Sequence, residues 1–170
     1  MGNIAVDPLS RAKIRRYAAL WRSVLGLEGF YIPIDTVLEI MACPLKDGEP
    51  LIEMEVCEDY EMPNEYAVYS PQKNLLRVRN SVYEGACASN PRDRFTLAHE
   101  LGHFVLHRHQ GDQLARSDKE IRAYQNPEWQ ANAFASEFLM PHDKIQGMSV
   151  DEVMKRCGTS KQAAEIALKN

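Results

Sequence analysis

The chain has 170 residues, of which 45% are hydrophobic and 26% are charged, a composition typical of a globular protein and not of a disordered or fibrous one. Its 20 basic and 24 acidic side chains give a net charge of −4, which disfavours nonspecific binding to nucleic acid through overall charge. No apolar run reaches the length of a membrane span, and the first residues lack the order of a secretory signal. We therefore expect one cytoplasmic domain that contacts neither a membrane nor nucleic acid directly.

The N-terminal segment predicts an amphipathic helix. Apolar residues recur at helical spacing between Ile14 and Leu25, and Gly26 ends the pattern. The basic side chains on its other faces are expected to face solvent, although they could contact an acidic partner. They are Arg11, Lys13, Arg15, Arg16 and Arg22.

The next segment predicts a second short helix and then strands. The helix is expected from Asp35, as its N-cap, to Pro44. Residues 51–57 alternate between apolar and polar side chains, as a half-buried strand does. Two further strand candidates, 65–69 and 75–78, are joined by a turn-rich segment. Together these features predict a small antiparallel sheet.

Two later helices are predicted from the same start signal. Asn90-Pro91 and Asn126-Pro127 each supply an N-cap and a proline for the first turn. The first helix is expected to continue to about His109 and the second to Met140, and residues 110–125 between them are expected to form a loop.

The C-terminal segment predicts two short helices between residues 150 and 168, separated at 158–160. This pattern is similar to a DNA-binding helix-turn-helix, but it has no flanking basic cluster. We expect a helical hairpin that packs on the core or holds a partner. The domain then comprises an N-terminal helix (1–30), a core segment (31–145) and the hairpin (146–170).

Histidines are concentrated in the first of the two Asn-Pro helices, and His99-Glu100-Leu101-Gly102-His103 forms an HExxH motif there. Residues four apart on a helix share one face, about 6 Å apart along the axis, so the two imidazoles can share a metal ion. Glu100 is turned about 100° away and suits a general base that does not bind the metal. The surrounding apolar residues predict a buried helix, in which such polar side chains need partners.

A catalytic zinc site needs a third protein ligand, and two later histidines are candidates. His107 lies about 12 Å of helix rise beyond His99, too far for both to bind one ion at about 2.1 Å. We expect His107 to support the site from behind or to pack in the core. His109 has the HExxHxxGxxH spacing, but Leu106 occupies the position of the helix-breaking glycine.

Glu128 is the third candidate, at the start of the second Asn-Pro helix. Asn132 lies one turn further on the same face and could hydrogen-bond a metal ligand. Small residues at Gly102, Ala131 and Ala135 would let the two helices approach closely. The alternative explanation for Glu128 is a carboxylate favoured by the helix dipole.

The stretch from Arg94 to His103, followed by Glu128 to Ala135 and Phe138 to Pro141, resembles the ImmA/IrrE family of metallopeptidases. The similarity is clear over residues 91–141, and a weaker similarity extends back to residues 32–35 and forward to the Ser160 region.

The resemblance implies an α+β, zincin-like fold in which the HExxH helix packs on a second helix that bears a ligand. It also implies that His99, His103 and Glu128 hold Zn²⁺, with Mn²⁺ as an alternative, and that Glu100 is the base. The implied activity is endopeptidase cleavage of a helix-turn-helix repressor or antitoxin, which relieves repression. One alternative is a toxin-like partner-binding component of a toxin–antitoxin or prophage pair, without physiological proteolysis. Another is a purely structural metal site, which would require four protein ligands.

Two details of the peptidase hypothesis are open at this level. An edge strand, with residues 75–78 as a candidate, could align an extended peptide by strand addition. Four side chains are candidates for stabilising the oxyanion: Tyr66, Tyr69, His107 and His142.

Overall fold

The computed structural model describes residues 3–46, 48–109, 115–117 and 121–170. None of the helices in these ranges is both long and apolar enough to cross a membrane. The elements in chain order are β1 (Asn3–Ala5), α1 (Arg11–Val24), α2 (Ile34–Ala42), β2 (Glu53–Cys57), η1 (Asp59–Glu61), β3 (Ala67–Ser70), η2 (Pro71–Lys73), β4 (Leu75–Arg79), α3 (Asn80–Cys87), α4 (Pro91–His107), β5 (Ala115–Ser117), η3 (Ala123–Gln125), α5 (Pro127–Leu139), α6 (His142–Ile145), α7 (Val150–Cys157) and α8 (Lys161–Lys169).

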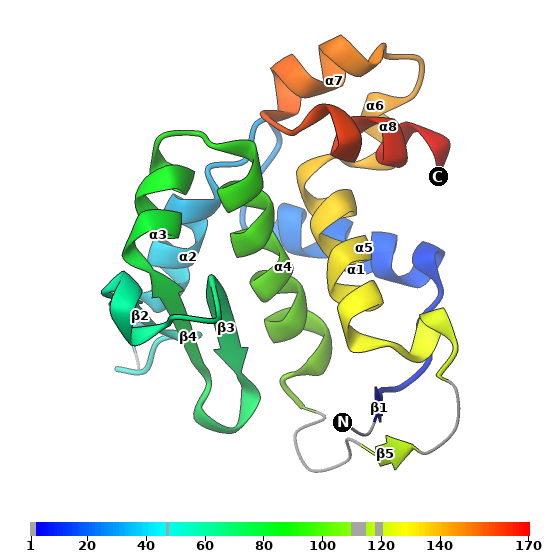
Figure 1. Ribbon diagram of the computed structural model, residues 1–170. Coiled ribbons are helices and arrows are strands. Elements are labelled where there is room, and N and C mark those ends of the chain that lie inside the picture. The colour runs from blue at the N-terminus through cyan, green and yellow to red at the C-terminus, as the bar shows by residue number, and fades with distance from the viewer. Residues whose placement is uncertain (1–2, 47, 110–114, 118–120) are drawn as a thin grey trace.

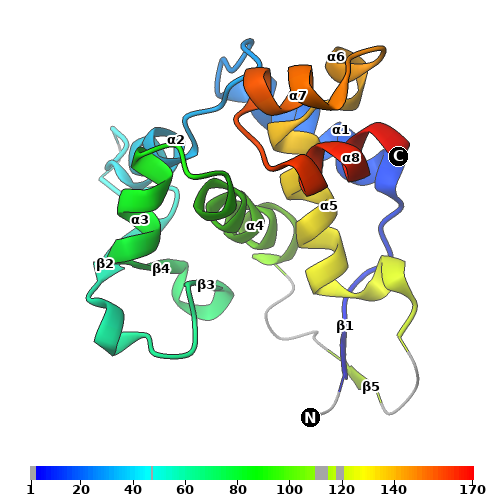
Figure 2. The same cartoon turned by 45° about the horizontal axis from the view of Figure 1, so that its top comes forward.

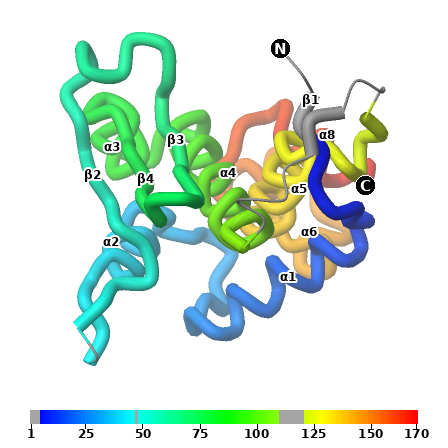
Figure 3. Tube along the Cα trace, turned by 90° about the horizontal axis from the view of Figure 1, so that it is seen from below, coloured from blue at the N-terminus to red at the C-terminus, as the bar shows by residue number. Residues whose placement is uncertain are grey.

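Helix α4 is the central element of this α+β fold (Figure 1). Strand β3 lies on one side of it and α5 on the other, an arrangement also visible from below in Figure 3. Three of its apolar side chains, Leu97, Leu101 and Phe104, are fully buried. The polar side chains of α4 are therefore held among packed neighbours on both sides.

The two Asn-Pro signals begin α4 and α5, as predicted. The Asn90 side chain accepts hydrogen bonds from the second and third backbone N–H groups of α4, and Asn126 does the same for α5. Each proline lies in the first turn of its helix. An N–H group at that position would have no acceptor within the helix, so the proline costs no hydrogen bond. Helix α4 ends at His107, two residues before the predicted end.

Gly102 brings α4 and α5 into close contact. A Cβ atom at this position would lie 3.0 Å from the Ala131 carbonyl oxygen and 3.3 Å from the Phe134 Cβ. The predicted close approach of the two helices is confirmed at this glycine.

The sheet is mixed, and the prediction of an antiparallel sheet is wrong for one strand pair. The strand order is β2-β4-β3, with β3 antiparallel to β4 and β2 parallel to β4. The short connection through η2 makes β3 and β4 a hairpin, whereas residues 58–66 are long enough to leave a strand position between β2 and β3 for β4. Strand β4 is therefore central, and the proposal that residues 75–78 form a free edge is also wrong.

Several elements were not predicted from the sequence, among them β1, β5 and α3. Within the predicted 110–125 loop, β5 pairs antiparallel with β1, whereas residues 110–114 and 118–120 lie outside the described residues. Helix α3 follows β4 directly and has only eight residues. Strands of three residues carry no periodicity of their own, so their formation depends on a distant partner.

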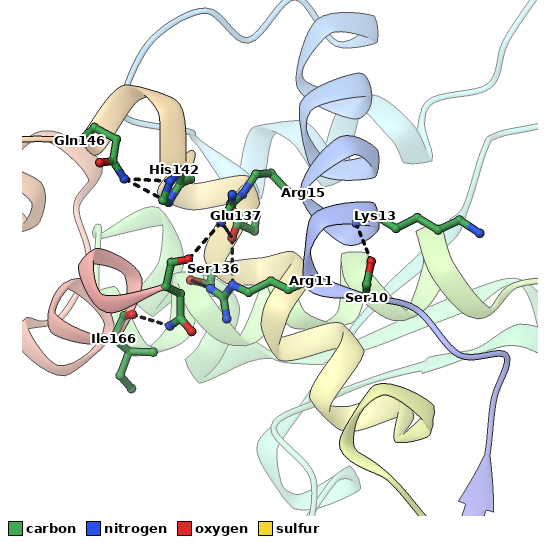
Figure 4. A network of polar contacts seen from close by, with 10 residues as sticks. Ser10, Arg11, Lys13, Arg15, Ser136, Glu137, His142, Gln146 and Ile166 are labelled. Carbon is green, nitrogen blue, oxygen red and sulfur yellow. Dashed lines mark hydrogen bonds and ion pairs between the residues drawn. The ribbon is translucent and has the colours of Figure 1, made fainter.

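Three arginines of α1 contact α5, so the prediction that its basic side chains face solvent is wrong for them. Arg11 and Arg15 form ion pairs with the buried carboxylate of Glu137, each at 3.0 Å (Figure 4). Arg22 is buried and donates to the Phe138 carbonyl at 2.7 Å. Acceptors at the end of α5 thus fix α1 to this helix.

The C-terminal hairpin of α7 and α8 lies near α5 (Figure 2), and Arg94 ties it to α4. The Arg94 guanidinium is fully buried and donates to the carbonyls of Cys157, at 2.9 Å, and Gly158, at the end of α7. It also donates to the Ile32 carbonyl at 2.7 Å. A cation at the C-terminal carbonyls of a helix is electrostatically favourable, so one α4 side chain holds the predicted hairpin in place.

Candidate metal centre

Side chains from α4 and α5 converge on one point. His99, His103 and Glu128 each present a ligand atom there, and they form a group that could hold a metal ion. The two Nε2 atoms are 3.0 Å apart. The Glu128 carboxylate oxygens lie 3.2 Å from His99 Nε2 and 3.3 Å from His103 Nε2.

These distances match the donor set of a divalent cation. Ligands at about 2.1 Å from a tetrahedral Zn²⁺ ion lie about 3.4 Å from one another, close to the three separations measured. Two imidazole nitrogens and one carboxylate also form one of the ligand sets of catalytic zinc. The residues present therefore fit the ion that the sequence implies.

The Glu128 carboxylate is the exposed member of the group, with 65% of its side chain accessible. Hydrogen bonding with His103 and His99 holds the pKa of this carboxyl well below its usual range. Glu128 is therefore an anion at neutral pH, which a cation ligand must be.

Behind His99, Asn132 fixes the orientation of the ring. Its Oδ1 lies 3.0 Å from His99 Nδ1 and accepts a hydrogen bond from the N–H there. The Nε2 atom of His99 is then free to face Glu128. Asn132 is one helical turn beyond Glu128, and the same face of α5 thus supplies both contacts.

Behind His103, a buried chain of hydrogen bonds begins. His103 Nδ1 lies 3.1 Å from His107 Nδ1, and His107 Nε2 lies 3.0 Å from Gln130 Oε1. Burial lowers the pKa of His107 to about 4, so the ring is neutral at pH 7. His107 is thus placed to support His103 and is not itself a member of the metal group.

Glu100 lies beside the group but is turned toward the sheet. It is 8% exposed, and its Oε2 accepts the backbone N–H of Tyr69 in β3 at 2.8 Å. Burial raises the pKa of the Glu100 carboxyl, while the nearby His103 and His99 oppose that shift. A carboxylate that holds its proton more tightly than usual is suited to accept and return one.

A hollow of about 700 Å³ opens between α4, α5 and α8. Its lining is largely apolar and includes Phe95, Trp129 and Ile166. Asn132 also lines it, and the same side chain binds His99. The hollow is therefore linked to the metal group through Asn132, although none of the three ligand candidates lines it.

The remaining sequence candidates are engaged elsewhere. His109 is not part of the metal group found in the described residues, and its ring accepts a hydrogen bond from Arg108. The Tyr69 hydroxyl donates to Asn74, and the His142 ring contacts Gln146. The Tyr66 ring lies under two guanidinium groups, those of Arg79 and Arg92.

Two contacts of the site were missed in the sequence. Gln130 gives no signal, because a glutamine on a helix is ordinarily exposed and here it is fully buried. The Tyr69 contact is made by a backbone N–H, which any residue at that strand position would provide.

The comparisons with known proteins bear on this geometry. The family model of the IrrE N-terminal-like domain, Peptidase_M78, matches residues 56–169. A solved structure, a Mycobacterium tuberculosis transcriptional regulator, matches with a TM-score of 0.59 and 19% identity over 90% of this chain and 45% of that chain. This likeness shows a shared fold, and the chain spans less than half the length of that regulator. No curated protein sequence matches the chain.

The matched segment contains every member of the metal group and the glutamate beside it. It also covers well over half of the chain. The chain therefore belongs to the IrrE N-terminal-like, Peptidase_M78, family.

Proposed function

We propose that the protein is a metal-dependent endopeptidase. His99, His103 and Glu128 are the metal ligands in this proposal, and Glu100 is the general base. The observation that carries it is the convergence of two Nε2 atoms and one carboxylate within 3.3 Å of one another, with a buried glutamate next to them. Zn²⁺ is the metal that this ligand set favours, with Mn²⁺ as the alternative.

The bound cation would polarise the peptide carbonyl and make water a better nucleophile near neutral pH. Glu100 accepts the proton of the attacking water and later delivers it to the leaving amine. The N–H of Tyr69 fixes one oxygen of Glu100, so the carboxylate is oriented before a substrate binds. Hydrolysis of this kind forms no covalent bond between the protein and its substrate.

The substrate is proposed to bind along β3, which replaces the 75–78 segment in this role. Arg79 donates its backbone N–H to the Tyr66 carbonyl, so alternate residues of β3, Ala67 and Tyr69, direct their backbone groups away from β4. The Tyr69 N–H is bound to Glu100, and an extended peptide can pair with the other backbone groups on that side of β3. It would then lie beside Glu100, because Tyr69 contacts this residue.

The proposed substrate is a regulatory protein of the helix-turn-helix repressor or antitoxin type. The support is that a Mycobacterium tuberculosis transcriptional regulator contains a domain of this fold. The apolar hollow next to Asn132 suits apolar side chains of such a partner.

The test is to incubate the zinc-loaded protein with each helix-turn-helix protein encoded beside it in its genome. We expect a discrete cut in one of them that Glu100→Gln abolishes, a loss of at least about 10²-fold, while binding of that protein and zinc content persist. Binding without cleavage by the unaltered protein would overturn the proposal and favour a toxin-like, partner-binding role.

A further inference from the structure

The hydrogen-bond chain behind His103 continues beyond His107 into the protein backbone. The Gln130 side chain is fully buried, and its Nε2 donates to the carbonyl oxygens of Asp7 and Tyr124, each at 2.8 Å. One carbonyl belongs to the segment between β1 and α1, and the other to η3. The chain therefore runs from the metal group to two fixed backbone acceptors.

These two acceptors determine which way the Gln130 amide faces. An amide NH₂ group has two protons, and here each has a carbonyl partner. The Oε1 atom must then be the end that faces His107, and it can only accept. It follows that His107 carries its proton on Nε2.

The position of this proton decides the state of the next ring. A neutral imidazole has one N–H, so with Nε2 protonated the Nδ1 atom of His107 is an acceptor. Its partner at 3.1 Å, His103 Nδ1, must therefore carry a proton. The Nε2 atom of His103 is then the nitrogen left to bind a cation.

We propose that Gln130 and His107 are positioning residues that select the metal-binding tautomer of His103. This inference rests on the proposed function, since it concerns a ligand of that metal site. Neither residue is itself a member of the metal group. The two backbone carbonyls fix the orientation of the Gln130 amide, and the amide fixes which nitrogen of His107 carries the proton. His107 in turn fixes which nitrogen of His103 carries the proton.

The two metal-binding histidines are supported in different ways. His99 relies on Asn132, an exposed amide. His103 relies on two buried side chains, His107 and Gln130, and on the backbone carbonyls that hold Gln130. Tautomer selection is thus built into the fold at His103.

The test uses three substitutions at His107. An asparagine carries its oxygen two bonds from Cβ, like Nδ1, and can still accept from His103. A glutamine carries its amide three bonds from Cβ, like Nε2, and can reach Gln130 but not His103. A phenylalanine keeps the ring and its packing but has no acceptor.

Zinc affinity is measured by competition with a chromophoric chelator, and folding is monitored by circular dichroism. We expect His107→Asn to bind zinc within about threefold of the unaltered protein, and His107→Gln and His107→Phe to bind about 10- to 100-fold more weakly. A role in packing alone predicts the opposite order, with phenylalanine best and asparagine worst, and that result would overturn the proposal.

A second measurement does not depend on any variant. Nitrogen NMR shifts of the His107 ring in the zinc-loaded protein should show a protonated Nε2 and a bare Nδ1, and a protonated Nδ1 would overturn the proposal. If the unaltered protein binds no zinc, the proposed metal site fails. If it binds zinc and all three variants bind it equally well, the positioning role alone fails.

Discussion

Two buried glutamates show how the same side chain serves different purposes in this fold. Glu137 of α5 is 3% exposed and is paired with two guanidinium groups, those of Arg11 and Arg15. Glu100 of α4 is 8% exposed, and its contacts are a backbone N–H and two neighbouring histidines. The burial is similar, but the partners differ.

The difference lies in how the negative charge is compensated. Two permanent cations pair with Glu137 and tie α1 to α5, so this carboxylate is part of the scaffold. Glu100 has no arginine or lysine among its described contacts, and burial raises its pKa. Burial of such a carboxylate costs free energy that its contacts only partly offset. This is typical of a catalytic position.

The largest effect is expected at Glu137. Glu137→Gln would leave two arginines near α5 without their counterion and should lower the free energy of unfolding by about 2–3 kcal/mol. This is less than the usual loss for a buried pair, because the arginines are 23% and 28% exposed.

Urea unfolding measures this change, and Glu100→Gln is the matched control. We expect the control to change stability by less than about 1 kcal/mol, because the neutral amide costs less to bury. If Glu100→Gln destabilised the protein as much as Glu137→Gln, the contrast between the two glutamates would be wrong.

A smaller effect is expected where α4 and α5 meet. The added Cβ of Gly102→Ala would press on the backbone of Ala131, which cannot rotate away. We expect a net loss of about 1–2 kcal/mol, since the gain in helix propensity only partly offsets the strain. Thermal unfolding measures this loss, and an unchanged or raised melting temperature would contradict the close contact.

The smallest effect is expected at Asn132. Asn132→Ala removes the acceptor of the His99 Nδ1 proton and should weaken zinc binding about tenfold, as measured by chelator competition. Ser136→Ala, one turn further along α5, is the control and should leave zinc affinity unchanged. Equal effects in the two variants would show that Asn132 does not orient His99.

Local signals in the sequence were sufficient to predict the framework of the site. The spacing of His99 and His103 and the Asn-Pro starts of α4 and α5 each depend on residues within one or two helical turns. Glu128 was identified because it opens the second of these helices. These predictions concern single helices and the residues on one face, which periodicity determines.

Features that depend on distant partners could not be predicted in this way. The central position of β4 follows from pairing with both β2 and β3, and the alternation of a strand does not name its neighbours. The pairing of Glu137 with α1 joins side chains more than 120 residues apart. The role of Gln130 arises from the carbonyls of Asp7 and Tyr124, which no sequence pattern marks.

The central claim is that two histidines and Glu128 bind one metal ion while Glu100 does not. The zinc content of the unaltered protein, Glu100→Gln and Glu128→Ala, each purified after zinc loading and dialysis, tests it most directly. We expect about one zinc ion per chain in the first two proteins and loss of most of the zinc in the third. Equal retention of zinc in Glu128→Ala, or none in the unaltered protein, would contradict the account.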